Sequence, residues 1–234
     1  MAGDRAGLKA KAYDTIKKRL ITCEYPPDTL LNEVQLSNSL GISRTPFREA
    51  VIQLEQEGFL RIMPKKGIYV TAITANDILQ IFQKRREIAP VTLLMARPNF
   101  QDEILLDFKR MFEGEEGSVI DSYHLDTAMH LYFIENCGNR YIIDMMHKVF
   151  DANTRIIVAS KQNQLHIQES RLEHIEILDS LLAGQNEKAA EQLSEHIIHC
   201  RKAALDNFYD SQPGAQNYEL TYMQYLDDRP LRAE

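Results

Sequence analysis

Three histidines and one aspartate in the second half of the chain have the residue types and spacing of a metal site. Asp126 and His130 are four residues apart, so on a helix they share one face. His174 and His196 lie in two further segments, each beside leucines and isoleucines that would face a core. Three imidazoles and a carboxylate suit a divalent ion such as Zn²⁺, Ni²⁺ or Mn²⁺. The spacing alone equally allows hydrogen-bonded or surface histidines.

A second group of reactive side chains lies in the segment "GISRTPFREAV" near the N-terminus. Arg44 and Arg48 are four residues apart, where Ser43 opens an expected helix. At a helix N-terminus, where the N–H groups add partial positive charge, Arg44, Thr45 and Arg48 can reach the base edges or phosphates of DNA, and Ser43 can join them. The alternative is an ordinary cap at Ser43 and solvated arginines, with Glu49 as a possible partner.

The surrounding elements predict a winged helix-turn-helix domain over residues 1–73. Apolar spacing indicates helices near residues 8–20, 32–40 and 43–58, the last two joined by "LGIS". The β-rich runs "FLRIM" and "IYVTAI" follow, separated by "PKKG". This pattern is a hairpin whose tip holds Lys65, Lys66 and Gly67, and its lysines suit a DNA backbone or minor groove.

Charge divides the chain in the same way. Residues 1–73 contain eleven Lys/Arg and eight Asp/Glu, a formal charge of +3, whereas residues 74–234 contain sixteen and twenty-six, a formal charge of −10. A basic front and an acidic back indicate two modules with different partners, and the front can meet a polyanion although the whole chain is acidic.

Residues 74–210 show helical periodicity throughout and predict an all-α bundle. Pro90 predicts a kink or a break in the first of its helices. The remaining residues, 211–234, are a tail without a clear period. The expected helices span residues 76–96, 101–112, 118–136, 139–160, 167–183 and 187–209.

Composition limits the location of the protein. No apolar run approaches the length of a membrane span, and the N-terminus lacks a signal-peptide core. Cys23, Cys137 and Cys200 are an odd number without metal-knuckle spacing, which favours free thiols in a reducing cytoplasm. We therefore expect a cytoplasmic protein without a membrane partner.

The segment "LNEVQLSNSLGISRTPFREAVIQLEQEGFLRIMPKKGIYV" resembles the N-terminal domain of GntR-type bacterial transcription regulators. The resemblance implies a homodimer on a short palindromic operator. It places the DNA contacts on Arg44, Thr45, Arg48 and the wing tip around Lys66 and Gly67. The sequence departs from the family at two turn positions that usually hold glycine, where it has Cys23 and Asp28.

The motifs "DTAMH…CGN", "EHIEILDSLLAG" and "AAEQLSEH" resemble the FCD ligand-sensing domain of the FadR branch of these regulators. The resemblance implies that the four residues of the first paragraph hold the metal and that His199 and Cys200 are bystanders. It also aligns Arg85 in "FQKRREIAP" with an arginine that points toward an acid effector, while Ala89 replaces the usual glutamate.

Bidentate binding of a carboxylate by a guanidinium is the physical reason to expect a small organic acid as effector. Arg155 is a second candidate for this contact, and Arg85 has the alternative of pairing with a carboxylate on a neighbouring helix.

These features predict a metabolite-responsive DNA-binding regulator, with repression as the expected mode. One alternative is a constitutive DNA-binding dimer whose bundle and metal are purely structural. Another is a metal-dependent enzyme, since three histidines and an aspartate around a metal can activate water. The enzyme is disfavoured because no motif places a general base or a nucleophile near these ligands.

Overall fold

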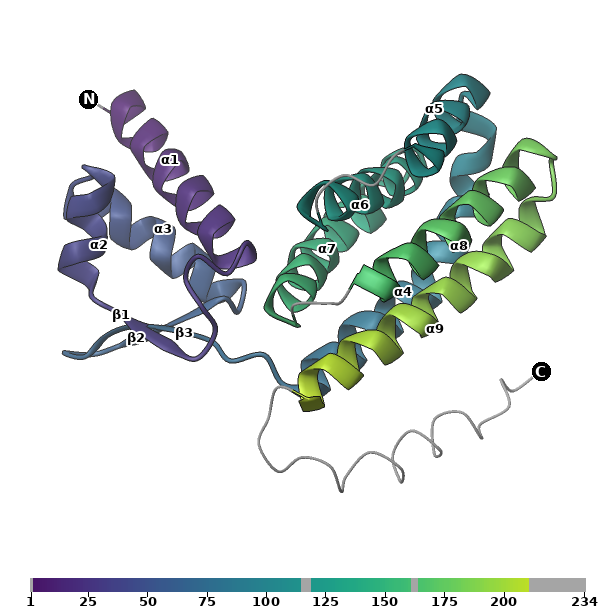
Figure 1. Ribbon diagram of the computed structural model, residues 1–234. Coiled ribbons are helices and arrows are strands. Elements are labelled where there is room, and N and C mark those ends of the chain that lie inside the picture. Colours follow the sequence, from purple (N-terminus) through teal and green to yellow (C-terminus); the bar gives the residue numbers. More distant parts are fainter. Residues whose placement is uncertain (1, 115–118, 161–163, 211–234) are drawn as a thin grey trace, which may run out of the picture.

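The computed structural model describes residues 2–114, 119–160 and 164–210 (Figure 1). The predicted tail, residues 211–234, lies outside the described residues. The chain forms a small N-terminal domain of three helices and a sheet, followed by a larger group of helices, as the sequence predicts. The predicted boundary at residues 73 and 74 falls in the connection between β3 and α4.

The three N-terminal helices are α1 (Ala2–Ile21), α2 (Glu33–Leu40) and α3 (Arg44–Gln56). Asn32 starts α2, because its side chain accepts the N–H of Gln35 at 3.0 Å, and Gly41 ends it with a φ of 63°. Ser43 precedes α3 but makes no side-chain capping hydrogen bond. The apolar faces of the three helices share one core that includes Ile16, Leu20, Leu36, Phe47 and Leu54. This is the predicted helix-turn-helix.

The sheet has three strands in the order β1-β3-β2, namely β1 (Thr29–Leu31), β2 (Leu60–Met63) and β3 (Gly67–Val70), all antiparallel. The sequence predicts the β2–β3 hairpin but not β1. Pairing of β1 with β3 requires a glycine at position 67, at the start of β3. There φ is +130°, and a Cβ would lie 2.5 Å from the carbonyl oxygen of Leu31 in β1. Gly67 is therefore a structural residue of the wing.

The second domain contains α4 (Ala75–Ala96), α5 (Asp102–Glu113), α6 (Val119–Glu135), α7 (Arg140–Ser160), α8 (Gln164–Leu182) and α9 (Asn186–Asp210), with a 3₁₀ turn at Arg97–Asn99. A common core joins these helices through residues such as Phe82, Leu93, Met129 and Leu178. The helix α4 continues through Pro90, so the break that the sequence allowed is absent. Among the described helices, none is long and apolar enough to cross a membrane.

Candidate metal centre and ligand pocket

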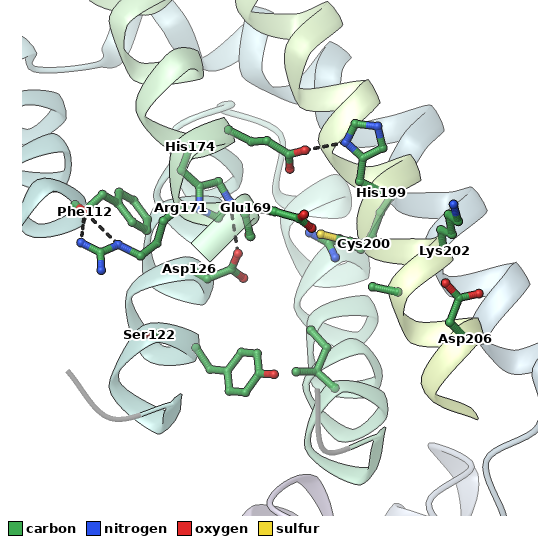
Figure 2. Close-up of a pocket in the computed structure, with 16 residues that line it drawn as sticks. Phe112, Ser122, Asp126, Glu169, Arg171, His174, His199, Cys200, Lys202 and Asp206 are labelled. Atoms are coloured by element: carbon green, nitrogen blue, oxygen red, sulfur yellow. Dashed lines mark hydrogen bonds and ion pairs between the residues drawn. The ribbon is translucent and has the colours of Figure 1, made fainter. Parts of the chain in front are cut away.

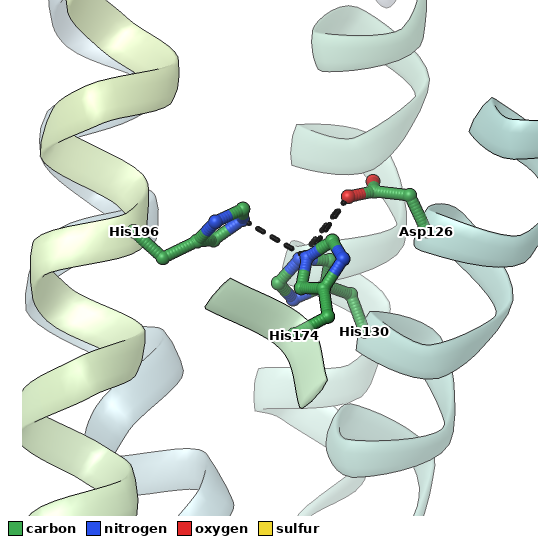
Figure 3. Close-up of side chains that lie close together, drawn as sticks. All are labelled: Asp126, His130, His174 and His196. Atoms are coloured by element: carbon green, nitrogen blue, oxygen red, sulfur yellow. Dashed lines mark hydrogen bonds and ion pairs between the residues drawn. The ribbon is translucent and has the colours of Figure 1, made fainter. Parts of the chain in front are cut away.

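The four predicted metal ligands converge from three helices: Asp126 and His130 from α6, His174 from α8 and His196 from α9 (Figure 3). One ligand atom from each lies within 4.8 Å of all the others. The Nε2 atom of His174 lies 3.1 Å from Oδ1 of Asp126 and 3.2 Å from Nε2 of His196. Ligands about 2.0–2.1 Å from a shared Zn²⁺ are themselves roughly 3 Å apart, so this donor set fits a divalent ion.

Glu173, next to His174 on α8, orients one of these ligands and was not predicted from the sequence. Its Oε2 lies 2.7 Å from Nδ1 of His196, and its Oε1 lies 2.5 Å from Nδ1 of His199. Because an ionised carboxylate only accepts hydrogen bonds, Nδ1 of His196 donates, which leaves the lone pair of its Nε2 facing the cluster. The only sequence signal for this role was the position of Glu173 in the "EHIEIL" motif.

The environment of the cluster favours neutral imidazoles and an ionised carboxylate, the protonation states in which these side chains bind a metal. Burial lowers the pKa of His196 to about 4, and the facing His174 adds to the effect. Burial also lowers the pKa of His130 well below its usual range, although Asp126 opposes the shift. For Asp126, burial alone would raise the pKa, but the facing imidazoles, His130 first, outweigh it and lower the pKa. At neutral pH His130 and His196 are neutral and Asp126 is ionised, as metal binding requires.

Arg85 on α4 is a buried cation beside this cluster, with 1% of the residue exposed. Its NH1 donates to Oδ1 of Asn153 at 2.9 Å, its NH2 lies 3.5 Å from Nε2 of His130, and its Nε has no partner. Phe82 and Phe150 lie against the guanidinium, with ring centroids 5.4 and 4.9 Å away. Burial lowers the pKa of Arg85, but a guanidinium stays cationic. Among the described residues it forms no ion pair with a carboxylate; its partner on the neighbouring helix is an amide.

A pocket of about 480 Å³ opens beside the cluster and includes Arg85, Asp126 and His174 in its lining (Figure 2). Phe112 and Cys200 contribute to its wall, and burial raises the pKa of the Cys200 thiol to about 12, so this thiol is protonated. The lining also includes charged or ionisable side chains of both signs: Glu169, Arg171, Glu173, His199, Lys202 and Asp206. The pocket therefore joins a buried cation, which has no carboxylate partner among the described residues, to two of the four metal-ligand candidates, Asp126 and His174.

Arg155, the second predicted effector contact, lies outside this pocket. It is on α7, where its NH1 donates to Oγ1 of Thr71 at 3.2 Å and its NH2 donates to the Thr71 carbonyl oxygen. Asn153, two residues earlier, points toward Arg85 instead, because two residues turn a helix by about 200°. Arg155 contacts the N-terminal domain in this structure, and its role as an effector contact stays a prediction.

The predicted DNA-contacting side chains are exposed together on the other domain. Ser43, Arg44, Thr45 and Arg48 lie at the start of α3, and Lys65 and Lys66 lie in the β2–β3 connection. Arg48 is held by Glu33, with Nε 2.6 Å from Oε1. The sequence suggested Glu49 as a possible partner of the two arginines, and the structure adds Glu33 on α2 as a partner of Arg48.

Comparison with known proteins gives two family matches. Residues 8–70 match the model of bacterial regulatory proteins of the gntR family, and residues 80–199 match the FCD domain. The HTH-type transcriptional repressor RspR of Escherichia coli is 36% identical over 199 residues, which cover 81% of this chain and 86% of RspR. The HTH-type transcriptional repressor GlaR of the same species is 24% identical over 199 residues, which cover 80% of this chain and 90% of GlaR.

Solved structures share the fold. E. coli McbR/YncC matches with a TM-score of 0.75 at 18% identity, covering 86% of this chain and 98% of that chain. The Zn²⁺-bound FCD domain of the regulator TM0439 matches with a TM-score of 0.51 at 23% identity, covering 59% and 99%.

Proposed function

The chain belongs to the GntR family of bacterial regulatory proteins and is a transcription regulator with an FCD domain, and from this premise we propose that a small carboxylate bound at a metal ion controls its binding to operator DNA. Members of this family are transcriptional regulators and not enzymes. Two relatives are named repressors, which supports repression as the mode of action.

The observation that supports the effector most strongly is the unneutralised guanidinium of Arg85 in contact with the metal-ligand cluster. Its NH2 lies 3.5 Å from Nε2 of His130, a nitrogen that would coordinate the metal. Two cations placed so close together repel in a buried site. A carboxylate between them relieves the repulsion, because it accepts hydrogen bonds from the guanidinium and binds a divalent ion.

Asp126, His130, His174 and His196 fit a divalent ion, and the similar FCD domain of TM0439 is described as Zn²⁺-bound. When bound, the ion supplies a Lewis acid that holds the effector carboxylate. Zn²⁺, Ni²⁺ and Mn²⁺ all suit three imidazoles and a carboxylate. The residues of this chain then orient the effector through Arg85 and shape its pocket.

DNA binding is assigned to the exposed start of α3 and to the wing. Arg44 and Arg48 suit bidentate contacts to guanine in the major groove, with Ser43 and Thr45 on phosphates or bases. Lys65 and Lys66 suit the phosphate backbone. We assign two such DNA-binding domains to a homodimer, because each half of a palindromic operator is bound by one of them. Three exposed apolar residues of α4 offer a face for the second copy: Val91, Leu94 and Met95. They are 40–54% exposed, and Val91 lies three and four residues before the other two, on the same side of the helix.

The test combines metal analysis and ligand stabilisation of the purified full-length protein. We expect about one divalent ion per chain in the wild type and its loss in His174→Ala. Small mono- and dicarboxylic acids should raise the unfolding temperature of the Zn²⁺-loaded wild type, because a ligand of the native state stabilises it. Arg85→Met should remove this rise and retain the metal. Stabilisation that survives Arg85→Met, or a protein that binds no metal, would refute the effector site.

A further inference from the structure

Helix α7 contacts the ligand pocket with one side and the DNA-binding domain with the other. Asn153 faces the bundle and accepts the hydrogen bond from NH1 of Arg85. Asp151 and Arg155 each lie two residues away from Asn153, so they project from nearly the opposite side of the helix. In Figure 1, α7 lies on the side of the bundle that faces α1.

Two side chains of α7, Asp151 and Arg155, attach the DNA-binding domain to this outer side, and we call their contacts the docking contacts; Cys23 Sγ also lies 3.6 Å from the Arg155 carbonyl oxygen. In the first docking contact, Nζ of Lys17 on α1 lies 2.7 Å from Oδ2 of Asp151. In the second, the Arg155 guanidinium donates to Oγ1 and the carbonyl oxygen of Thr71, just after β3. The guanidinium also lies over the ring of Phe59, 5.7 Å from its centroid. Both contacts are partly or largely buried, since Lys17 is 19% and Arg155 is 7% exposed.

On the inner side of α7, Asn153 is a buried polar residue among the apolar side chains that pack this helix against the bundle. This residue is 1% exposed, its Nδ2 has no partner, and its Oδ1 accepts only from Arg85 among the contacts of the described residues. An anion that turns the Arg85 guanidinium away from α7, so that NH1 no longer points at Asn153, removes this bond. Asn153 is then left buried with neither of its polar atoms paired, an arrangement that folded proteins avoid. The most direct relief is a shift or rotation of α7.

We propose that α7 couples the occupancy of the Arg85 pocket to the attachment of the DNA-binding domain. The inference rests on the proposed function, because the anion is the effector of that site. Loss of the Arg85–Asn153 bond displaces α7, which weakens the Lys17–Asp151 and Arg155–Thr71 contacts and releases the DNA-binding domain from its fixed orientation. The effector thus acts on the DNA-binding domain through α7, a helix that contacts both the Arg85 pocket and that domain.

Hydrogen–deuterium exchange of the full chain, without DNA or added metal, tests this coupling. Arg85→Met imitates the withdrawal of Arg85 and leaves Asn153 unpaired. We expect exchange in peptides covering residues 17–25 and 59–71, which contain the docking contacts, to accelerate by about threefold or more, while the α3 core around Leu54 is unchanged. Asn153→Asp keeps and strengthens the bond to Arg85, so its exchange at the docking contacts should equal or fall below that of the wild type.

Arg171→Met is the matched control, because Arg171 lines the same pocket but donates to the Phe112 and Gly114 carbonyl oxygens at the end of α5. It should leave exchange at the docking contacts unchanged. Asp151→Asn should accelerate that exchange, and adding Arg85→Met to it should have little further effect.

Three results would each overturn the coupling. The first is unchanged exchange in Arg85→Met, and the second is an equal acceleration in Arg171→Met. The third is an exchange rate in the double variant that is accelerated by the product of the two single-variant factors. If Arg85→Met does not fold, Asn153→Leu removes the same bond from the other side and is held to the same outcomes. Because the measurement uses neither DNA nor metal, its failure leaves the proposed regulator and its metal site standing.

Discussion

Glu173→Ala is expected to weaken Zn²⁺ binding although it removes none of the four proposed ligands. In the wild type, the Glu173 carboxylate accepts from Nδ1 of His196 at 2.7 Å and so fixes the tautomer whose Nε2 lone pair faces the metal. Without Glu173, the Nδ1–H of His196 loses its partner when the metal is bound. An unpaired buried donor costs about 1–3 kcal/mol. Since about 1.4 kcal/mol is tenfold in affinity, the dissociation constant for Zn²⁺ should rise roughly 5- to 150-fold.

The affinity is measured by titrating zinc-free protein with Zn²⁺ against a fluorescent chelator of known affinity. Glu176→Ala is the matched control, because Glu176 is exposed on the same helix, and it should bind as the wild type does. Glu173→Gln retains one acceptor oxygen and should fall between wild type and Glu173→Ala. If Glu173→Ala binds Zn²⁺ as tightly as the wild type while His174→Ala does not bind, the orienting role of Glu173 is refuted.

Three further outcomes are expected. Arg48→Ala should weaken binding to a selected operator duplex by about 1–3 kcal/mol in fluorescence anisotropy. Glu33→Gln frees Arg48 and should strengthen the binding. If both variants bind the duplex with the affinity of the wild type, the assignment of DNA contacts to the start of α3 is contradicted. Gly67→Ala should destabilise the N-terminal domain by more than about 1 kcal/mol in thermal unfolding, because its Cβ meets the Leu31 carbonyl oxygen, while Gly7→Ala, with open space around it, should not. The metal-free protein should lose up to about 3 kcal/mol of its free energy of unfolding as pH falls from about 6.5 to 4. The reason is that the unfolded chain protonates His196 in that range, whereas the folded chain, in which the pKa of His196 is about 4, does not. A free energy of unfolding that stays constant across this range in urea titrations would contradict the prediction.

The helices could be predicted from the sequence because their apolar periodicity and breakers are local signals. The strand β1 could not, since three residues after two prolines show no alternation and pair only through the distant β3. Asp28, whose N–H donates to the Val70 carbonyl oxygen, leads into β1 with a φ of 60°, and Cys23 has a φ of 53° just after the end of α1. These are the two positions where the family usually has glycine, so the turn geometry is kept without the residue that adopts it most easily.

The convergence of the metal ligands followed from a motif resemblance, while their orientation did not. His196 and Glu173 are 23 residues apart on different helices, so their hydrogen bond depends on how α8 packs against α9. Arg155 shows the same limit. Its apolar neighbours predict a helix, but which side of α7 faces the pocket is decided by packing on both sides of that helix.

Ala89 gives the absence of the family glutamate a physical consequence. A glutamate at this position, four residues after Arg85 on α4, would have the spacing of an ion pair with the arginine. Ala89 is instead 5% exposed in the apolar core, and Arg85 bonds the neutral amide of Asn153. A neutral acceptor leaves the positive charge of the guanidinium uncompensated, so an incoming anion gains more from Arg85 than it would beside a carboxylate. In this chain the hydrogen-bond partner of NH1 of Arg85 comes from α7 and not from its own helix. In the coupling that we propose, the absence of a glutamate at position 89 therefore links the binding of an effector to α7, the helix that contacts the DNA-binding domain.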